Sequence, residues 1–407
     1  MSLHFVKDNV NIDFVGKRKL GFCLSGTLIL LALLSMFFGR GLNLGIDFAG
    51  GVIAQVQFQQ AVADETLKKG LDKYDLTGLT IQSYGDDSRN YLLRFSSGSK
   101  NSVELRTQIE DSLAKAFPDN KASIERLEVV GPKVGKDLTE KGLSALFYAI
   151  LTIAVYISGR FEQRWVAGAI MAACLWGGTY VLGAISTHFL GGAIGTGTLV
   201  CFALAVTLLV CFLMRLNFAL GAIACLIHDV IISMGVLSVM GIDIDLNVLA
   251  AILTIIGYSL NDTIIVYDRL RENLRMHQDW EIGRLINRSI NQTLARTVLT
   301  SGTTILACLA LFIFGGGVIH SFALTMLCGV IIGTYSSIFV ASPILIALGD
   351  TAYYVRVYQK VEYEKPGEHG LLPLFSLPRR GFPPAGLFLF SGIDDRNVML
   401  IFLLENK

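Results

Sequence analysis

Long apolar runs without charged residues recur along this chain and constrain its fold more than any other feature. The first, Leu20–Phe38, is long enough to cross a hydrocarbon core about 30 Å thick as a helix. The composition agrees, because 53% of the 407 residues are hydrophobic and only 16% are charged, against about 25% charged residues in soluble proteins. The chain is therefore predicted to be a polytopic α-helical membrane protein with about eight spans. The seven further spans are predicted at Gly142–Gly159, Trp165–Ser186, Thr198–Met214, Leu216–Met240, Leu246–Tyr267, Thr297–Phe314 and Ser321–Leu348.

The basic residues of the short loops predict the orientation of these spans, because cytoplasmic loops carry an excess of Lys and Arg. Lys17–Lys19 precede the first span, whereas the loops at Thr187–Gly197, Gly241–Asp245 and Gly315–His320 contain neither residue type. We therefore expect both termini in the cytoplasm. The connection between the sixth and seventh spans is predicted to be cytoplasmic on account of its arginines, Arg269, Arg271, Arg275, Arg284, Arg288 and Arg296.

The polar stretch Arg40–Lys141, after the first span, predicts a small external α+β domain. Its elements follow the order β-α-β-β-α-β, which is typical of a ferredoxin-like unit. Within Gly45–Val130 there is no His, no Cys and no arrangement of nucleophile and base, so we expect this domain to bind or brace rather than to catalyse. The six elements are predicted at Val52–Phe58, Asp64–Tyr74, Leu79–Tyr84, Tyr91–Phe95, Val103–Phe117 and Ser123–Val130.

Charge and motifs argue against several classes of function. With 34 Lys and Arg against 33 Asp and Glu, the net charge is +1, so no nucleic acid partner is expected. No Walker A sequence, HExxH motif or paired-cysteine signature occurs, so neither a cofactor nor a metal is expected. The chain is not predicted to be an enzyme.

One carboxylate lies inside a predicted span. Asp262 is within Leu246–Tyr267, and a carboxylate there costs a few kcal/mol, so it normally marks a pathway, a relay or an ion site. Burial favours the neutral form and a nearby cation the charged form, so Asp262 can alternate between them. The candidate cation is Arg296, at the mouth of the next span. The alternative is that Asp262 only ends the membrane stretch or pairs with Arg296. The supporting polar residues are Tyr258, Asn261, Thr263, Thr300 and Ser301.

Two further polar groups occur in spans. His228 and Asp229 lie inside Leu216–Met240, where a relay and a hydrogen-bonded contact between helices are equally compatible with the sequence. Gly333–Ser337, in the last span, is small and rich in hydroxyls. Because small residues let helices approach closely, packing is the favoured interpretation of this segment.

Several segments together resemble the SecF family of the bacterial SecDF protein-export complex, within the resistance-nodulation-division superfamily. The most specific is Leu253–Asn273, which contains the Asn-Asp-Thr motif. Leu44–Gly51, with Asp47, Gly50 and Gly51, follows the first span, and Gly131 and Pro132 precede the second. The other matching segments are Arg160–Glu162, His228–Asp229, Ser289–Thr297 and Gly333–Pro343.

The resemblance implies an auxiliary subunit of the Sec protein translocase in the bacterial inner membrane. It implies SecD, the SecYEG translocon, the translocating unfolded preprotein and protons as partners, with YajC and YidC as further partners. It also implies that the proton-motive force assists export and that Asp262 and Arg296 take part in proton conduction. Two alternatives stay open: a proton-coupled small-molecule exporter of the same superfamily, and a scaffold subunit that conducts no protons.

The chain departs from the family pattern in two places. The family has six spans, whereas Trp165–Met214 adds two where the second family span leads into the third. The tail from about Val361 has no family assignment. The predicted organisation is a cytoplasmic N-terminus (1–19), a first span (20–38), a periplasmic α+β domain (39–141), a second span and its loop (142–164), a two-span insert (165–214), a four-span bundle with the proton-pathway residues (215–348) and a cytoplasmic tail (349–407).

Overall fold

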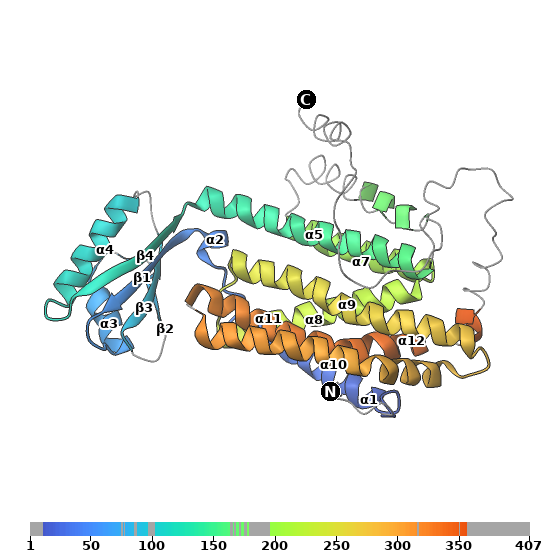
Figure 1. Cartoon of the computed structure of the whole chain (residues 1–407). Coiled ribbons are helices and arrows are strands. Elements are labelled where there is room, and N and C mark those ends of the chain that lie inside the picture. The colour runs from blue at the N-terminus through green and yellow to red at the C-terminus, as the bar shows by residue number, and fades with distance from the viewer. Residues whose placement is uncertain are drawn as a thin grey trace, which may run out of the picture. The chain divides into compact units, whose positions relative to one another are not determined.

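A computed structural model describes residues 11–74, 76, 78–84, 88–96, 102–162, 166, 168–170, 172–174, 177–178, 196–315, 317–349 and 351–355. All of them belong to one compact unit, Met1–Val361. Long helices pack side by side in a bundle, and a small α+β domain follows the first of them (Figure 1). The bundle helices are α1 (Arg18–Phe38), α5 (Pro132–Glu162), α7 (Thr196–Leu213), α8 (Asn217–Met240), α9 (Leu246–Met276), α10 (Ile282–Phe314), α11 (Gly317–Ser336) and α12 (Ser342–Leu348).

Six helices among the described residues are long and apolar enough to cross a membrane. They run over Arg18–Phe38, Pro132–Phe161, Asn217–Met240, Leu246–Met276, Ile282–Phe314 and Ile319–Leu348. Of the two additional predicted spans, Thr198–Met214 coincides with the apolar helix α7, and most of Trp165–Ser186 lies outside the described residues. The count of eight spans therefore stays a prediction.

The connection between the sixth and seventh predicted spans is much shorter than the sequence suggested. Instead of a loop from 268 to 296, α9 continues to Met276 and α10 begins at Ile282. The reason is an amphipathic pattern, because Leu270 and Leu274 are buried, as are Leu285, Ile286 and Ile290 in the facing helix. Of the arginines that ended the apolar runs in the sequence, Arg275, Arg284, Arg288 and Arg296 are exposed on this helical hairpin, whereas Arg271 is largely buried and packs over the ring of Phe161.

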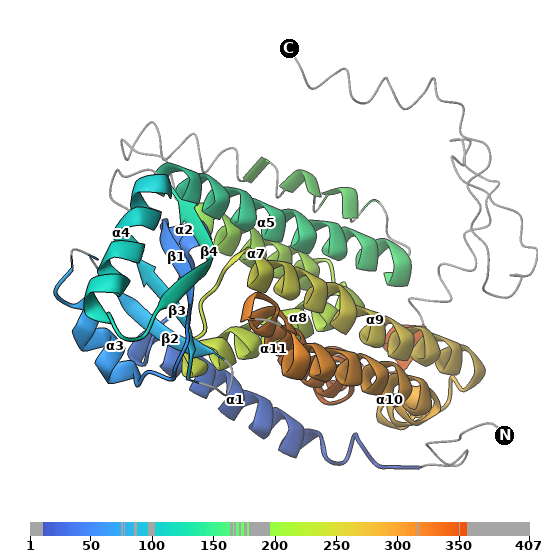
Figure 2. The same cartoon turned by 60° about the vertical axis from the view of Figure 1, so that its left-hand side comes forward.

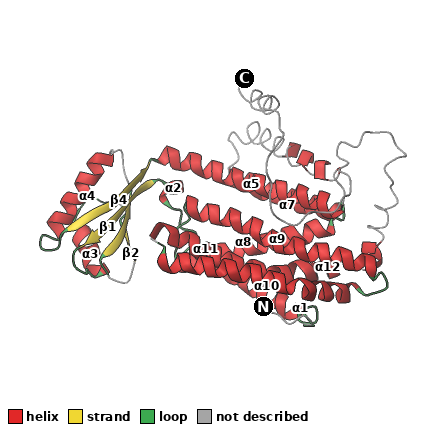
Figure 3. Cartoon of the chain, in the orientation of Figure 1, coloured by secondary structure: helices red, strands yellow, loops and turns green. Residues whose placement is uncertain are grey.

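The external domain is a four-stranded antiparallel sheet with the strand order β2-β3-β1-β4. Helices α3 and α4 cover one face of it and share a single apolar core with the sheet (Figure 2). Figure 3 places the strands of the described residues in this domain. The element order β-α-β-β-α-β agrees with the sequence prediction, while the ferredoxin-like class and the periplasmic location stay predictions. The elements are β1 (Gly51–Phe58), α3 (Asp64–Leu71), β2 (Thr80–Tyr84), β3 (Asn90–Phe95), α4 (Ser102–Ala116) and β4 (Ala122–Val130).

The short helix α2 (Ile46–Ala49) joins this domain to the bundle. Gly50 and Gly51, directly after it, have φ angles of +74° and +138°, which disfavour any residue with a side chain. A Cβ on Gly50 would also lie 3.1 Å from the Cα of Pro132, the first residue of α5. Gly131 has open space around it, and its carbonyl accepts from the N–H of Gly135 at 3.0 Å. The sequence motifs around Gly50 and Pro132 therefore meet where β1, β4 and α5 come together.

The loop between α8 and α9 completes this junction. The N–H of Gly45 donates to the carbonyl of Ile244 at 2.7 Å, and the carboxylate of Asp47 accepts from the N–H of Leu246 at 3.0 Å. Arg94 on β3 forms an ion pair with Asp243 in the same loop. The beginning of α9 is thus bonded both to α2 and to the sheet.

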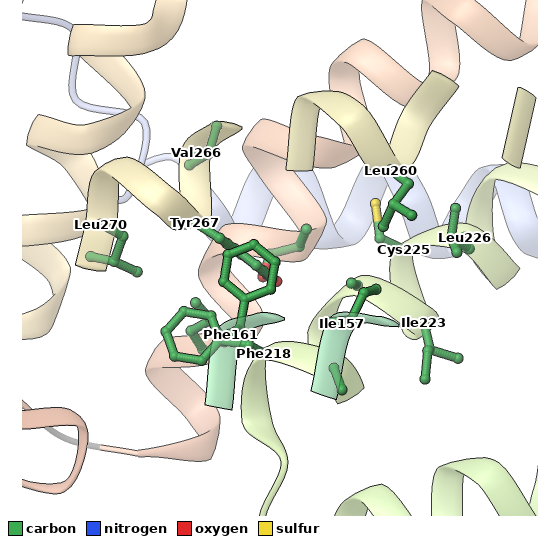
Figure 4. Packing of buried hydrophobic residues seen from close by; sticks show 14 of the residues in the cluster. Ile157, Phe161, Phe218, Ile223, Cys225, Leu226, Leu260, Val266, Tyr267 and Leu270 are labelled. Atoms are coloured by element: carbon green, nitrogen blue, oxygen red, sulfur yellow. The ribbon is translucent and has the colours of Figure 1, made fainter. Parts of the chain in front are cut away.

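Three aromatic residues pack together among the buried apolar side chains of the bundle core (Figure 4). Phe161 from α5, Phe218 from α8 and Tyr267 from α9 pack against one another with ring centroids 5.1–5.8 Å apart. The hydroxyl of Tyr267 donates to the carbonyl of Ala341 at 3.0 Å. A Cβ on Gly221 would lie 2.5 Å from that hydroxyl, so this position has room only for glycine.

Gly235→Ala should destabilise the bundle, because a Cβ at Gly235 on α8 would lie 2.2 Å from the Cβ and 2.6 Å from the Cα of Ala32 on α1. Overpacking of this kind costs about 1–3 kcal/mol, so the thermal unfolding midpoint of the detergent-solubilised chain should fall. The matched control is Gly257→Ala on α9, where nothing lies within 4 Å of the added Cβ and the midpoint should not fall. Equal midpoints for the two variants would contradict the close approach of α1 and α8.

Asp245→Asn should stabilise the chain at pH 7. The carboxylate of Asp245 caps α9 by accepting from the N–H of Val248 at 2.7 Å, yet burial first, and then the nearby Asp47, raises its pKa above the ordinary 3.8. The folded state therefore favours the neutral carboxyl of Asp245. Its contribution to stability is fully present at or below pH 3.8 and is lost as the pH rises and the carboxyl ionises.

Asparagine keeps the cap without the charge, so the thermal midpoint should rise at pH 7 and the difference should vanish near pH 4. Asp243→Asn is the control in the same loop, and it should lower the midpoint at pH 7 because it breaks the pair with Arg94. If Asp245→Asn raised the thermal midpoint equally at pH 7 and pH 4, the result would contradict the raised pKa of Asp245.

Candidate functional site

Asp229, on α8, is the most extensively bonded carboxylate among the described residues of the bundle. It is 1% exposed. Its Oδ2 accepts hydrogen bonds from the hydroxyls of Ser259 on α9 and Ser336 on α11, the latter at 2.9 Å. Its Oδ1 lies 2.8 Å from Nδ1 of His228. Three helices therefore converge on one buried carboxylate.

His228 extends this cluster to a fourth helix. Its Nε2 lies 3.0 Å from Oγ of Ser25 on α1, and that hydroxyl lies 3.1 Å from the hydroxyl of Tyr335 on α11. Tyr335 in turn donates to the carbonyl of Gly21 at 2.7 Å. The interpretation of His228 and Asp229 as an interhelical contact therefore agrees with the geometry, and the cluster is larger than the sequence indicated.

Asp262, on α9, has the same burial and far fewer partners. It is 1% exposed, and its Oδ2 accepts one long hydrogen bond, 3.3 Å, from Ser301 on α10. Its Oδ1 and the nearby hydroxyl of Thr297 are buried without a hydrogen-bond partner among the described residues. An ionised carboxylate is costly in this setting, because a charge removed from water needs donors or a counter-charge. Protonation removes that cost, so the site suits a carboxyl that changes its charge.

Arg296 does not contact Asp262. Its side chain is exposed on α10 and forms no ion pair with any residue that the structure describes. Asp262 is thus bonded inside the bundle through Ser301, whereas Arg296 faces outward from it. An exposed guanidinium on a membrane helix is available to a neighbouring protein or to the membrane surface.

The other predicted polar residues divide into two groups. Tyr258 donates to Thr304 on α10 at 3.2 Å, and Ser301 has the contact to Asp262 given above. Thr263 donates to the carbonyl of Ser259 in its own helix, as Thr300 does to the carbonyls of Arg296 and Thr297. Asn261 is exposed on α9. Of these predicted residues, only Tyr258 and Ser301 form side-chain hydrogen bonds between α9 and α10.

Helix α11 links the two acids, which the sequence did not reveal. Thr334 donates to the hydroxyl of Ser301, the partner of Asp262, at 2.7 Å. Two residues further on, Ser336 donates to Asp229. The hydroxyl-rich segment had been assigned to packing, and packing does contribute, because a Cβ on Gly333 would lie 2.9 Å from that of Ser259. The signal in the sequence is the run of four residues with hydroxyls, Thr334 to Ser337, inside an apolar span, which the sequence alone did not connect with the two acids.

No group of three or more His, Cys, Asp or Glu that could hold a metal ion occurs among the residues that the structure describes. Cys225, one turn before Asp229, lies 3.1 Å from the hydroxyl of Ser336 and belongs to the same polar cluster. Its Sγ contacts are with Ser336, Thr263 and Asp229, at 3.1–4.0 Å. The chemistry that this arrangement supports is the binding and transfer of protons between carboxyl, imidazole and hydroxyl groups.

Family models match most of the chain. The model described as "Protein export membrane protein SecD/SecF, C-terminal" matches residues 108–187 and 183–351, and the model described as "SecD/SecF GG Motif" matches residues 35–62. The two pieces of the first match meet inside the predicted insert 165–214. The GG match includes Gly50 and Gly51 at the junction between the sheet and α5.

Similar proteins point to the same family. The protein translocase subunit SecF of Desulfurispirillum indicum is 39% identical over 363 residues, which cover 88% of this chain and 97% of that protein. The SecF subunit of Calditerrivibrio nitroreducens is 37% identical over 345 residues, covering 84% and 95%. The crystal structure of SecDF, a translocon-associated membrane protein from Thermus thermophilus, matches with a TM-score of 0.59 and 31% identity. That match covers 85% of this chain but 39% of the SecDF chain.

Asp229→Ala should lower the thermal unfolding midpoint far more than Asp262→Ala. Removing Asp229 leaves His228, Ser259 and Ser336 buried without their shared partner, and breaking a buried pair costs about 3–5 kcal/mol. Removing Asp262 breaks one long hydrogen bond and also removes a buried oxygen that has no partner among the described residues. The thermal midpoint of that variant should therefore stay close to that of the unchanged chain. Equal losses for both variants, measured in the same detergent, would contradict this difference in bonding.

Proposed function

We propose, from the premise that this chain belongs to the SecF family of protein-export membrane proteins, that it is an auxiliary subunit of the Sec protein translocase and uses the proton-motive force together with SecD to assist protein export. The observation that carries the proton-driven part is Asp262, a buried carboxylate in a membrane helix with one oxygen unpaired among the described residues. In this proposal Asp262 takes up and releases the proton. Arg296, exposed on the neighbouring helix, provides the positive charge near the same pathway.

The energetics are sufficient for such a role. One elementary charge crossing 100 mV of membrane potential releases about 2.3 kcal/mol. That energy biases a two-state equilibrium by about fiftyfold, which is enough to favour one position of a small domain over another. The proposal therefore needs one proton site coupled to one movable contact.

Helix α9 is the element that provides this coupling. It begins at its cap Asp245, at the junction where Leu246 donates to Asp47. It continues without interruption past Asp262, about 25 Å along the helix axis from the cap. A change of charge at Asp262 that shifts α9 against α10 therefore acts on the loop that holds the external domain.

The partners and the location of the chain follow the same proposal. SecD is the partner named together with SecF in the matching SecDF structure and family model. The SecYEG translocon, YajC, YidC, the unfolded preprotein and protons remain proposed partners. The chain is proposed to span the bacterial inner membrane several times, with both termini in the cytoplasm and residues of about 39–141 in the periplasm.

Asp262→Asn and Arg296→Ala should each abolish the stimulation of export by the proton-motive force, because the first cannot ionise and the second removes the charge. The measurement is secretion of a preprotein in cells that lack their own SecF. Glu281→Gln at the start of α10 and Arg275→Ala near the end of α9 are matched controls at exposed positions, and both should complement the loss.

Full complementation by both site variants would disprove the assigned mechanism. Normal secretion by Asp262→Asn, with loss of secretion when the whole chain is deleted, would instead identify a scaffold that conducts no protons.

A further inference from the structure

We propose that His228 and Asp229 form a second proton-binding site, and that the pair holds two protons between them in this structure. One of these protons is exchangeable, so the pair is neutral when loaded and carries one negative charge when it has released that proton. The inference deepens the proposed function, since it adds a proton site to the one at Asp262. Its test is a direct measurement of proton binding and does not depend on export.

The argument begins with four contacts that form a continuous chain. Asp229 Oδ1 contacts His228 Nδ1 at 2.8 Å, and His228 Nε2 contacts Ser25 Oγ at 3.0 Å. Ser25 Oγ contacts the hydroxyl of Tyr335 at 3.1 Å, and that hydroxyl contacts the carbonyl of Gly21 at 2.7 Å. Each contact needs one hydrogen, so the chain needs four.

The available hydrogens determine the protonation of the pair. A carbonyl oxygen only accepts, so the single hydroxyl hydrogen of Tyr335 is used on Gly21. Tyr335 must therefore accept from Ser25, whose single hydrogen is used in turn. The hydrogen between Ser25 and Nε2 must then come from the imidazole, and a further hydrogen must lie between Nδ1 and the carboxyl. The pair supplies both.

Two arrangements meet this demand. In one, the imidazole carries a hydrogen on each nitrogen and Asp229 is ionised; in the other, the imidazole carries its hydrogen on Nε2 and the carboxyl is protonated. Both hold two protons and are neutral overall. A neutral imidazole beside an ionised Asp229 holds only one, and it leaves either the contact of Ser25 with Tyr335 or that of Nδ1 with the carboxylate without a hydrogen.

The surroundings of the pair favour a neutral state. His228 is 3% exposed and Asp229 1%, and no cation contacts either of them among the residues that the structure describes. A net negative charge without a counter-charge is costly in such an interior. The two hydroxyls on Oδ2, from Ser259 and Ser336, lower that cost without removing it. The other titratable groups facing the pair are Cys225 on α8 and Tyr335 on α11, and Tyr267 on α9 lies beyond Cys225.

Release of the exchangeable proton has a structural consequence. The imidazolium and carboxylate become imidazole and carboxylate, and the proton passes to solvent. Nε2 then accepts from Ser25, whose hydrogen turns away from Tyr335. One hydrogen bond between α1 and α11 is lost, while the bonds from Ser259 and Ser336 to Asp229 remain. The pair thus couples its proton to the contact between these two helices.

The test uses the full chain, labelled with ¹⁵N-histidine and reconstituted in lipid bilayers. Of the six histidines, His228 is identified by the signal that disappears in His228→Gln. At neutral pH we expect either both ring nitrogens protonated, or Nε2 protonated together with an infrared carboxylic acid band that is lost in Asp229→Asn. As the pH rises, the pair should release one proton. A neutral ring protonated on Nδ1 without that band at every pH, or two protons at every pH at which the chain stays folded, would overturn the inference.

Tyr335→Phe provides the second variant, and it keeps the aromatic ring. Without the hydroxyl, the hydrogen of Ser25 is free for Nε2, so the singly protonated pair satisfies both of its remaining contacts. The variant should bind the exchangeable proton roughly fivefold more weakly, which corresponds to about one hydrogen bond. An unchanged titration of His228 in a folded Tyr335→Phe protein would contradict the hydrogen count.

Asp262→Asn separates this inference from the proposed function. His228 should keep its two protons at neutral pH in that variant, because none of the four contacts involves Asp262. A normal titration of His228 combined with full export by Asp262→Asn would refute the proposed mechanism and leave the second site intact. A single proton on the pair combined with loss of export would refute the second site alone.

Discussion

A membrane interior offers no water to a polar side chain, so each buried polar group in the bundle must find its partner in the protein. Asp229 meets this requirement with a histidine and two serine hydroxyls, and these groups come from α8, α9 and α11. The bonds are possible only where helices approach closely, as at Gly333, which packs against Ser259. The arrangement of α1, α8, α9 and α11 therefore follows from the need to satisfy one carboxylate and its histidine.

The two buried acids, Asp229 and Asp262, differ in the number of hydrogen bonds that they accept, and their roles differ accordingly. Asp229 fixes the relation of four helices, and the cost of breaking its contacts keeps them together. Asp262 has a single long bond to Ser301, and its second oxygen is unpaired among the described residues. Because Asp262 has so few hydrogen bonds, a change of its charge breaks few contacts. The same bundle thus combines a stable polar cluster with a labile carboxyl, and α11 contacts both through Thr334 and Ser336.

Sequence patterns identified the apolar helices and the charged residues inside them. They did not show in which direction individual side chains point from those helices. Apolar runs predicted the six helices able to span a membrane, and a charge inside such a run identified Asp262 and Asp229. The extension of α9 and α10 beyond the apolar runs was missed, because the hairpin is amphipathic and most of its arginines are exposed. Serines and threonines are common in spans and often bond their own helix, as Thr300 does. The bonds of Ser25 and Ser336 to neighbouring helices therefore could not be foreseen, nor could the outward orientation of Arg296.

Helix α11 contacts both acids, Asp229 directly through Ser336 and Asp262 through Thr334 and Ser301, and its geometry changes just after these contacts. Directly after Ser336 the helix widens into a π-helical turn, Ser337–Ala341, and Pro343 follows with no N–H to donate. The widened turn is held by side chains, because Ser342 donates to the carbonyl of Ser337 at 2.9 Å and Tyr267 to that of Ala341. The π-helical turn therefore separates α11, whose Thr334 and Ser336 reach the two acids, from α12.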